Sequence, residues 1–214
     1  LALQYAAEPF RADREVVLAS VANDGLALLH AATALTDDKE LALAAVSLWG
    51  AALEYTSERL RGDREVVLAA VKRWGVALQY AATPLRSDKE IVLAAVTTDG
   101  LALPYASPEL RLDKDIVLAA VRNCGSALAH AGVRLRADKE VAMKAVGARG
   151  QALRYVAPQL QADGEVVLEA AKTWGSALTL APKAMQRDAG FVKEVVRMRF
   201  LGLQGTQPNV AWRA

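Results

Sequence analysis

The chain has 214 residues, of which 53% are hydrophobic and 23% charged, and 26 Lys and Arg against 24 Asp and Glu leave a net charge of +2. The apolar content excludes a disordered chain, and charges or glycines interrupt every apolar run well short of a transmembrane span. The lone Cys124 excludes a disulfide-linked scaffold. Charge this close to neutral does not favour a dedicated nucleic-acid-binding protein, which usually carries a clear basic excess.

A 25-residue repeat recurs without insertion or deletion over residues 1–200. Position 2 of the repeat is Ala, position 3 is Leu and position 13 is Asp in all eight copies, and position 25 is Gly in the first seven. The copies start at Leu1, Leu26, Ala51, Val76, Leu101, Ser126, Gln151 and Ser176. A fixed period of this length predicts one array of stacked repeats over residues 1–200, followed by a helix end and an extended tail over 201–214.

In the repeat that spans residues 76–100, the first expected element is a helix of about two turns over 77–82. Thr83 and Pro84 end this helix, because proline cannot continue it. Leu85 and the apolar residues at the same position of the other repeats are expected to fill the corner that follows.

The second expected element of the repeat is a longer helix, which Asp88 starts. Its carboxylate can accept hydrogen bonds from the free N–H groups of the first turn, and Glu90 in that turn suits the helix dipole. Gly100 is expected to end the helix in the left-handed conformation. The predicted apolar face contains Val92, Leu93, Ala95 and Val96.

Two such helices cannot bury both of their faces alone, so each repeat must pack on its neighbours. The sequence therefore predicts an all-α fold, an α-solenoid of eight two-helix repeats. The last repeat departs from the pattern, with Gly190 for Glu, Lys193 for Leu and Phe200 for Gly. We interpret it as a divergent C-terminal capping repeat whose helix continues to about Leu203. The first repeat has no such substitutions, which leaves room for further repeats or another domain before Leu1.

No pattern in the sequence indicates catalysis. All five tyrosines and both histidines, His30 and His130, fall on position 5, which favours a half-buried ring with a polar tip over a metal ligand or an acid–base role. The carboxylates at positions 13 and 15 recur along the array, which favours helix capping over acid–base chemistry. The sequence has no nucleotide-binding or hydrolase motif. We expect no enzyme activity, no cofactor and no metal.

Position 24, just before the glycine, varies from repeat to repeat. In repeat arrays the recurring positions maintain the fold, whereas varying positions such as this one can face a partner. Trp49, Trp74 and Trp174 stand there, and the first two belong to adjacent repeats and can form one aromatic patch. The alternative is that these rings pack between repeats as part of the seam. The candidate partner-binding residues are Trp49, Trp74, Trp174, Arg73, Arg149 and Trp212.

Basic residues recur at position 11, from Arg11 to Arg136, and at position 14, from Arg14 to Lys139. Stacked helical repeats can read RNA one base at a time, so a sequence-tolerant RNA-binding array is one alternative. Each basic residue, however, stands beside the ladder of Asp and Glu, which favours ion pairs between repeats. A nucleic-acid partner is therefore not expected.

The segment Ala52-Leu53-Glu54-Tyr55, followed by Leu60-Arg61-Gly62-Asp63-Arg64-Glu65-Val66-Val67-Leu68-Ala69-Ala70-Val71, resembles the tandem repeats of the family described as domain of unknown function (DUF4116). The resemblance extends over residues 1 to 175. It implies a helical repeat that serves as an interaction module, and it supplies no catalytic residues.

Together these observations indicate a non-catalytic scaffold that binds a protein or peptide, or serves as a structural subunit of a larger assembly. An RNA-binding array and the regulatory arm of a longer enzyme are the alternatives. The given chain shows neither a signal peptide nor a membrane span, and we expect an intracellular location.

Overall fold

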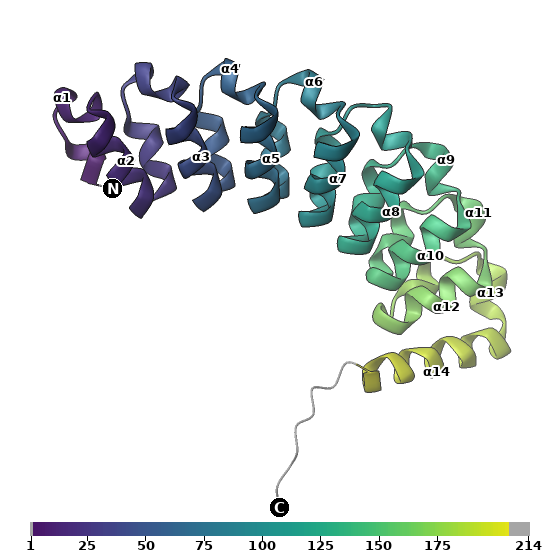
Figure 1. Ribbon diagram of the computed structural model, residues 1–214. Coiled ribbons are helices and arrows are strands. Elements are labelled where there is room, and N and C mark those ends of the chain that lie inside the picture. The colour runs from purple at the N-terminus through teal and green to yellow at the C-terminus, as the bar shows by residue number, and fades with distance from the viewer. Residues whose placement is uncertain (1, 206–214) are drawn as a thin grey trace, which may run out of the picture. The chain divides into compact units, whose positions relative to one another are not determined.

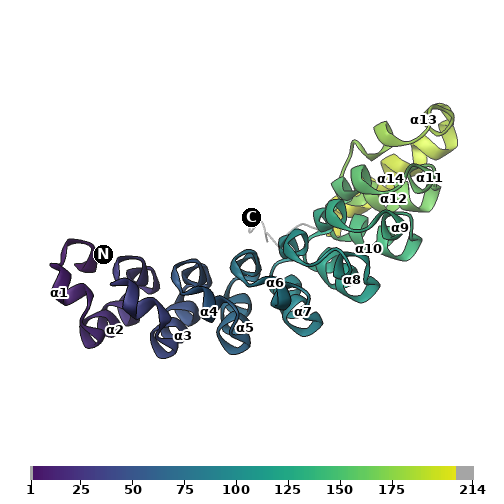
Figure 2. The same cartoon turned by 90° about the horizontal axis from the view of Figure 1, so that it is seen from above.

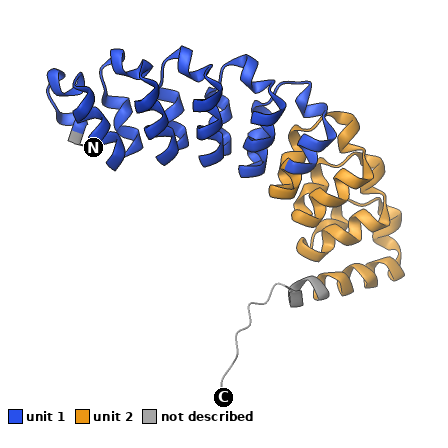
Figure 3. Cartoon of the chain, viewed as in Figure 1, with its two compact units in different colours: residues 1–119 blue, residues 120–214 orange. Residues whose placement is uncertain are grey.

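The computed structural model describes residues 2–205, and the elements in this range are helices only (Figure 1). Residues 1 and 206–214, Trp212 among them, lie outside the described residues. The chain divides into two compact units, residues 1–119 (unit 1) and 120–214 (unit 2), and the division falls inside one helix (Figure 3). No helix in the described range is long and apolar enough to span a membrane.

The elements of unit 1 alternate between short 3-10 helices, labelled η, and α-helices. In chain order they are η1 (Ala2–Tyr5), α1 (Glu8–Arg11), α2 (Arg14–Asn23), η2 (Gly25–His30), η3 (Thr33–Asp37), α3 (Lys39–Leu48), η4 (Gly50–Tyr55), α4 (Glu58–Arg61), α5 (Arg64–Arg73), η5 (Gly75–Tyr80), α6 (Thr83–Arg86), α7 (Lys89–Thr98), η6 (Gly100–Tyr105), η7 (Leu110–Leu112) and the start of α8 (Lys114–Asn123).

Unit 2 continues the same pattern from the end of α8. Its elements are η8 (Gly125–His130), α9 (Val133–Arg136), α10 (Lys139–Ala148), η9 (Gly150–Tyr155), α11 (Pro158–Gln161), α12 (Gly164–Thr173), η10 (Ala177–Leu180), α13 (Lys183–Arg187) and α14 (Ala189–Gly205).

Each repeat therefore holds three helical segments rather than the predicted two. The residues on either side of η5, Trp74 and Ala81, are extended, so only six residues remain between them. A segment this short gains little from α-helical hydrogen bonds and forms a 3-10 helix instead. Pro84 lies in the first turn of the one-turn helix α6, where its missing N–H costs nothing.

Within unit 1 the ten-residue helices α2, α3, α5 and α7 follow one another side by side (Figure 1 and Figure 2). The 3-10 helices pack against them and against one another as a second layer. In unit 2, α12 packs between α10 and α14. The array of helical repeats expected from the 25-residue period is confirmed in both units.

The core lies between the two layers and between successive repeats. Ala77 and Leu78 of η5 are fully buried. On α7 the fully buried residues are Ile91, Val92, Ala95 and Val96. Leu93, expected on this face, is 39% exposed instead, because it lies on the far side of the helix from Ile91 and Ala95.

The predicted helix start is confirmed. Asp88 Oδ1 accepts hydrogen bonds from the N–H groups of Glu90 at 2.9 Å and Ile91 at 3.1 Å. The aspartate at position 13 caps the long helix in the same way in all eight repeats, from Asp13 to Asp188. These caps satisfy N–H groups that have no partner inside the helix.

The role predicted for the glycine at position 25 is wrong, because none of the described glycines has a positive φ. A Cβ added to Gly75 would lie 2.2 Å from the carbonyl oxygen of Ala95, and one added to Gly150 would lie 2.2 Å from that of Ala170. The glycine is needed because the backbone of the next repeat approaches too closely for any side chain. Gly175 has no such neighbour, since a Cβ added to it would lie 3.6 Å from the nearest atom, Arg199 Nε.

The final helix, α14, has 17 residues and runs two residues beyond the predicted Leu203. Its Val196 is 64% exposed, whereas Val96 at the same position of a middle repeat is fully buried. The last repeat thus exposes an apolar position that is buried in a middle repeat. Lys193 is exposed, and its counterpart Leu93 is already partly exposed in a middle repeat.

Candidate partner-binding site

The tyrosines and histidines at position 5 differ in how far they are buried. His30 is half-buried, as predicted, whereas His130 and Tyr5 are exposed. Partial burial and a hydrogen bond with Glu54 raise the pKa of Tyr80 above its usual value. Within residues 2–205, no three His, Cys, Asp or Glu side chains converge on a common point where a metal ion would be held.

The predicted ion pairs between repeats are present at the N-terminal ends of the long helices. The basic residue at position 14 reaches the carboxylates at positions 13 and 15 of the next repeat. The pairs are Arg14 with Asp38 (2.7 Å) and Glu40, Lys39 with Asp63 and Glu65 (both 2.8 Å), Arg64 with Asp88 (3.3 Å) and Glu90, Lys89 with Asp113 (2.7 Å) and Asp115 (3.4 Å), and Lys139 with Asp163 (2.8 Å) and Glu165 (2.6 Å).

These pairs shift the pKa values of both partners. The hydrogen bond from Arg14 lowers the pKa of Asp38, and the one from Lys139 lowers the pKa of Asp163. Asp163 and Glu165 in turn raise the pKa of Lys139. The basic residues at position 14 are therefore neutralised by the protein itself.

A pH dependence of stability follows from these shifts. The lowered pKa of Asp163 means that its contribution is complete above about pH 4, the unfolded value, and is lost as the pH falls through the lower folded value. The raised pKa of Lys139 means that its contribution is lost only above about pH 10. The urea midpoint should be level between these limits and fall below pH 4.

Two variants separate the ion pair from the helix cap. Asp163→Asn keeps a capping side chain but removes the charge that pairs with Lys139, so it should lower the midpoint at pH 7 and weaken the acid dependence. Asp188→Asn is the matched control, because Gly164 stands where the basic partner would be. Equal losses in the two variants would contradict a role for the ion pair.

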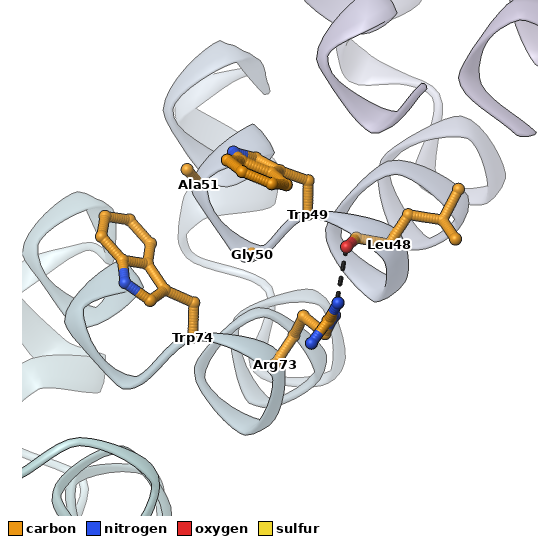
Figure 4. Close-up of a pocket in the computed structure, with 6 residues that line it drawn as sticks. All are labelled: Leu48, Trp49, Gly50, Ala51, Arg73 and Trp74. Carbon is orange, nitrogen blue, oxygen red and sulfur yellow. Dashed lines mark hydrogen bonds between the residues drawn. The ribbon is translucent and has the colours of Figure 1, made fainter. Parts of the chain in front are cut away.

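At the opposite, C-terminal ends of α3 and α5, Trp49 and Trp74 line one pocket of about 340 Å³ (Figure 4). Leu48, Gly50, Ala51 and Arg73 complete its lining. Figure 4 shows the two indole side chains, from adjacent repeats, bordering the same hollow with the backbone of Gly50 between them. The structure therefore brings together three of the predicted residues. We call this the tryptophan pocket.

The two indoles differ in how far they belong to the seam between repeats. Trp74 is half-buried, and its ring centroid lies 6.5 Å from that of Tyr80 in the next repeat. Trp49 is 52% exposed, and the neighbouring Leu48 is 44% exposed. Packing between repeats thus explains why Trp74 is partly buried, but it does not explain why Trp49 remains exposed.

Position 24 has a structural role that the tryptophans do not fulfil. Where it is aspartate, the side chain caps the following 3-10 helix: Asp24 accepts from Leu26 N–H at 3.0 Å and Asp99 accepts from Leu101 N–H at 2.9 Å. Trp49 and Trp74 provide no side-chain cap. These two repeats therefore carry a large, partly exposed apolar group in place of a stabilising hydrogen bond.

Arg73 lies at the rim of the pocket in a fixed orientation. Its Nε donates to the carbonyl oxygen of Leu48 at 3.1 Å, as the dashed line in Figure 4 marks. Lys72 precedes it and is exposed. No carboxylate of the described residues pairs with either side chain, in contrast to the basic residues at position 14.

The other predicted binding residues do not line this pocket. Trp174 and Arg149 belong to unit 2. The guanidinium carbon of Arg154 lies 5.0 Å from the ring centroid of Trp174, a cation–π contact that the sequence analysis missed. Arg149 is exposed, and Trp212 lies outside the described residues.

Leu48 and Ala51 are lining side chains that sequence reasoning overlooked, and Leu48 is the larger of the two. Position 23 is polar in the other repeats of unit 1, where Asn23, Arg73 and Thr98 occupy it. An apolar residue at a position that is otherwise polar and exposed was the available signal.

The family model described as domain of unknown function (DUF4116) matches residues 38–86, 63–111 and 113–161, which together make up more than half of the chain. Each match begins at a capping aspartate and spans nearly two repeats. The matches are narrower than the predicted range of 1–175. Neither a curated protein nor a solved structure matches the chain. By its repeated sequence and its helical structure, the chain belongs to the DUF4116 family.

Proposed function

We propose that the chain is a non-catalytic helical-repeat scaffold that binds a protein or peptide partner through the tryptophan pocket of unit 1. The observation that carries this proposal is the pair Trp49 and Trp74, which replace helix caps and line one pocket in adjacent repeats. Tryptophan is enriched among the residues that contribute most to binding energy at protein interfaces.

The size and lining of the pocket support a peptide-like occupant. Ligand pockets range over about 300–1,000 Å³, and this one, at about 340 Å³, lies at the small end. It has room for one or two side chains of a partner rather than for a large cofactor. Leu48, Trp49 and Trp74 offer apolar surface that an inserted side chain would remove from water.

The structure does not favour the RNA-binding alternative. The basic residues at position 14 are ion-paired, and at position 11 Arg86 Nε donates to the carbonyl oxygen of Tyr105 at 2.7 Å. The residues at position 14 and Arg86 thus link neighbouring repeats. We expect single-stranded RNA not to bind at low salt; an affinity that falls steeply with salt concentration would overturn this expectation.

The proposal is tested by capturing partners on the immobilised chain and quantifying them by mass spectrometry. Trp49→Ala and Trp74→Ala should each lower recovery of a specific partner by about tenfold or more, since truncation of a central tryptophan often costs 2 kcal/mol. Leu112→Ala is the matched control, because Leu112 is 58% exposed in unit 1 and does not line the pocket. Partners recovered equally by all variants would contradict the proposal.

A further inference from the structure

We infer that the tryptophan pocket takes an acidic peptide segment, in which one large apolar side chain enters between the indoles and carboxylates flank it. This inference rests on the proposed function and specifies the partner's chemistry. The apolar part of the segment follows from the lining by Leu48, Trp49 and Trp74. The acidic part follows from the charge at the rim.

Arg73, the one charged residue that lines the pocket, has no carboxylate partner among the described residues. Lys72, which precedes Arg73 in sequence, is also exposed and also has no carboxylate partner there. At the same two positions, the neighbouring repeats have Ser47-Leu48 and Thr97-Thr98, so the basic pair distinguishes this repeat from its two neighbours. A ligand with carboxylates would complete the charge balance that the ion pairs complete elsewhere.

Arg73 is also oriented for such a ligand. The bond from its Nε to the carbonyl oxygen of Leu48 fixes the guanidinium beside the pocket. The terminal nitrogens remain able to donate to a carboxylate, for which the planar guanidinium fork is suited. Because this hydrogen bond already restricts the Arg73 side chain, Arg73 loses less conformational entropy on binding than an arginine without such a bond would lose.

A cationic ligand is the alternative that two indoles suggest, since aromatic pairs bind quaternary ammonium groups. The lining of this pocket contains no carboxylate, and its one charged member is Arg73. Glu54 is hydrogen-bonded with Tyr80, whose ring centroid lies 6.5 Å from that of Trp74. The charge at the rim therefore disfavours a cation and favours an anion.

The test uses four synthetic peptides of Gly and Ser that differ at their centre. The first carries Phe with Glu on both sides, the second replaces Glu with Gln, the third replaces Phe with Ala, and the fourth replaces Phe with trimethyllysine. Binding is followed by the indole N–H signals of the 15N-labelled chain. Trp49 and Trp74 report on the pocket, and Trp174 serves as the internal reference.

We expect the Phe–Glu peptide to shift the signals of Trp49 and Trp74 and to bind about tenfold more tightly than its Gln counterpart at low salt. In the Lys72→Gln/Arg73→Gln variant this ratio should fall to about one, with the preference for Phe over Ala retained. Added salt should likewise bring the ratio of the two affinities, for the Glu peptide over the Gln peptide, closer to one in the wild-type chain.

Other outcomes overturn the inference in distinguishable ways. Equal affinity for the Glu and Gln peptides would reject the acidic requirement but leave the proposed function standing. Tighter binding of the trimethyllysine peptide would identify the pocket as a cation site and reject the inference. If none of the peptides shifts Trp49 or Trp74 at millimolar concentration, both the inference and the proposed peptide-binding function fail.

Discussion

Gly150→Ala should lower the free energy of unfolding by about 3 kcal/mol, although it adds only one methyl group. That methyl carbon would lie 2.2 Å from the carbonyl oxygen of Ala170 and 2.7 Å from Trp174 Cβ. Both atoms are fixed by their own repeat, so the two repeats must move apart. Urea denaturation followed by circular dichroism measures the change.

Gly147→Ala, three residues earlier, is the matched control. Gly147 lies inside α10, and its nearest neighbour is the flexible side-chain atom Glu169 Oε1 at 3.4 Å. Alanine should stabilise this helix by about 0.5–1 kcal/mol. If Gly150→Ala were as well tolerated as Gly147→Ala, the close approach of the repeats would not explain why glycine recurs at position 25.

Trp49→Asp/Trp74→Asp should abolish partner binding and leave the fold intact. The backbone already suits aspartate: Trp74 has φ −149° and ψ 104°, and the capping Asp99 has φ −147° and ψ 112°. Each new aspartate is expected to cap the following 3-10 helix, which offsets the loss of apolar contacts to within about 1 kcal/mol. Binding should weaken by more than a hundredfold, since two central anchors are lost.

Asp99→Ala is expected to have the opposite effect: it should lower stability and leave partner binding unchanged. Asp99 caps η6 through Leu101 N–H and does not line the tryptophan pocket. Its removal should cost about 1 kcal/mol of stability and leave partner binding unchanged. A double tryptophan variant that unfolds, or one that still binds, would show that position 24 of these repeats serves the seam rather than a partner.

The features that were predictable from sequence are those that depend on one or two residues at fixed spacing. Asp88 and its equivalents begin every long helix because capping is local, and the ion pairs such as Lys39 with Asp63 follow from charges one repeat apart. The glycine was misinterpreted because a glycine after a helix has both a local and a tertiary explanation. Only the distance from Gly75 to Ala95 separates the two.

The same limit applies to the candidate site. Trp49, Trp74 and Arg73 stand out in sequence because positions 23 and 24 vary, whereas positions 2, 3 and 13 are the same in every repeat. The exposure of Leu48 and the contact of Arg154 with Trp174 depend on how side chains of different repeats approach one another. A period places residues in register, but it does not specify which of them remain exposed.

Site-specific photocrosslinking tests most directly whether the tryptophan pocket is the binding surface. A benzoylphenylalanine in place of Ala51, which lines the pocket, should yield a discrete adduct with the partner in the native cell extract. The adduct should disappear when Trp49→Asp and Trp74→Asp are added, and it should be absent when the same group replaces Leu112 instead. An adduct that survives both aspartates, or that forms equally from position 112, would contradict the account.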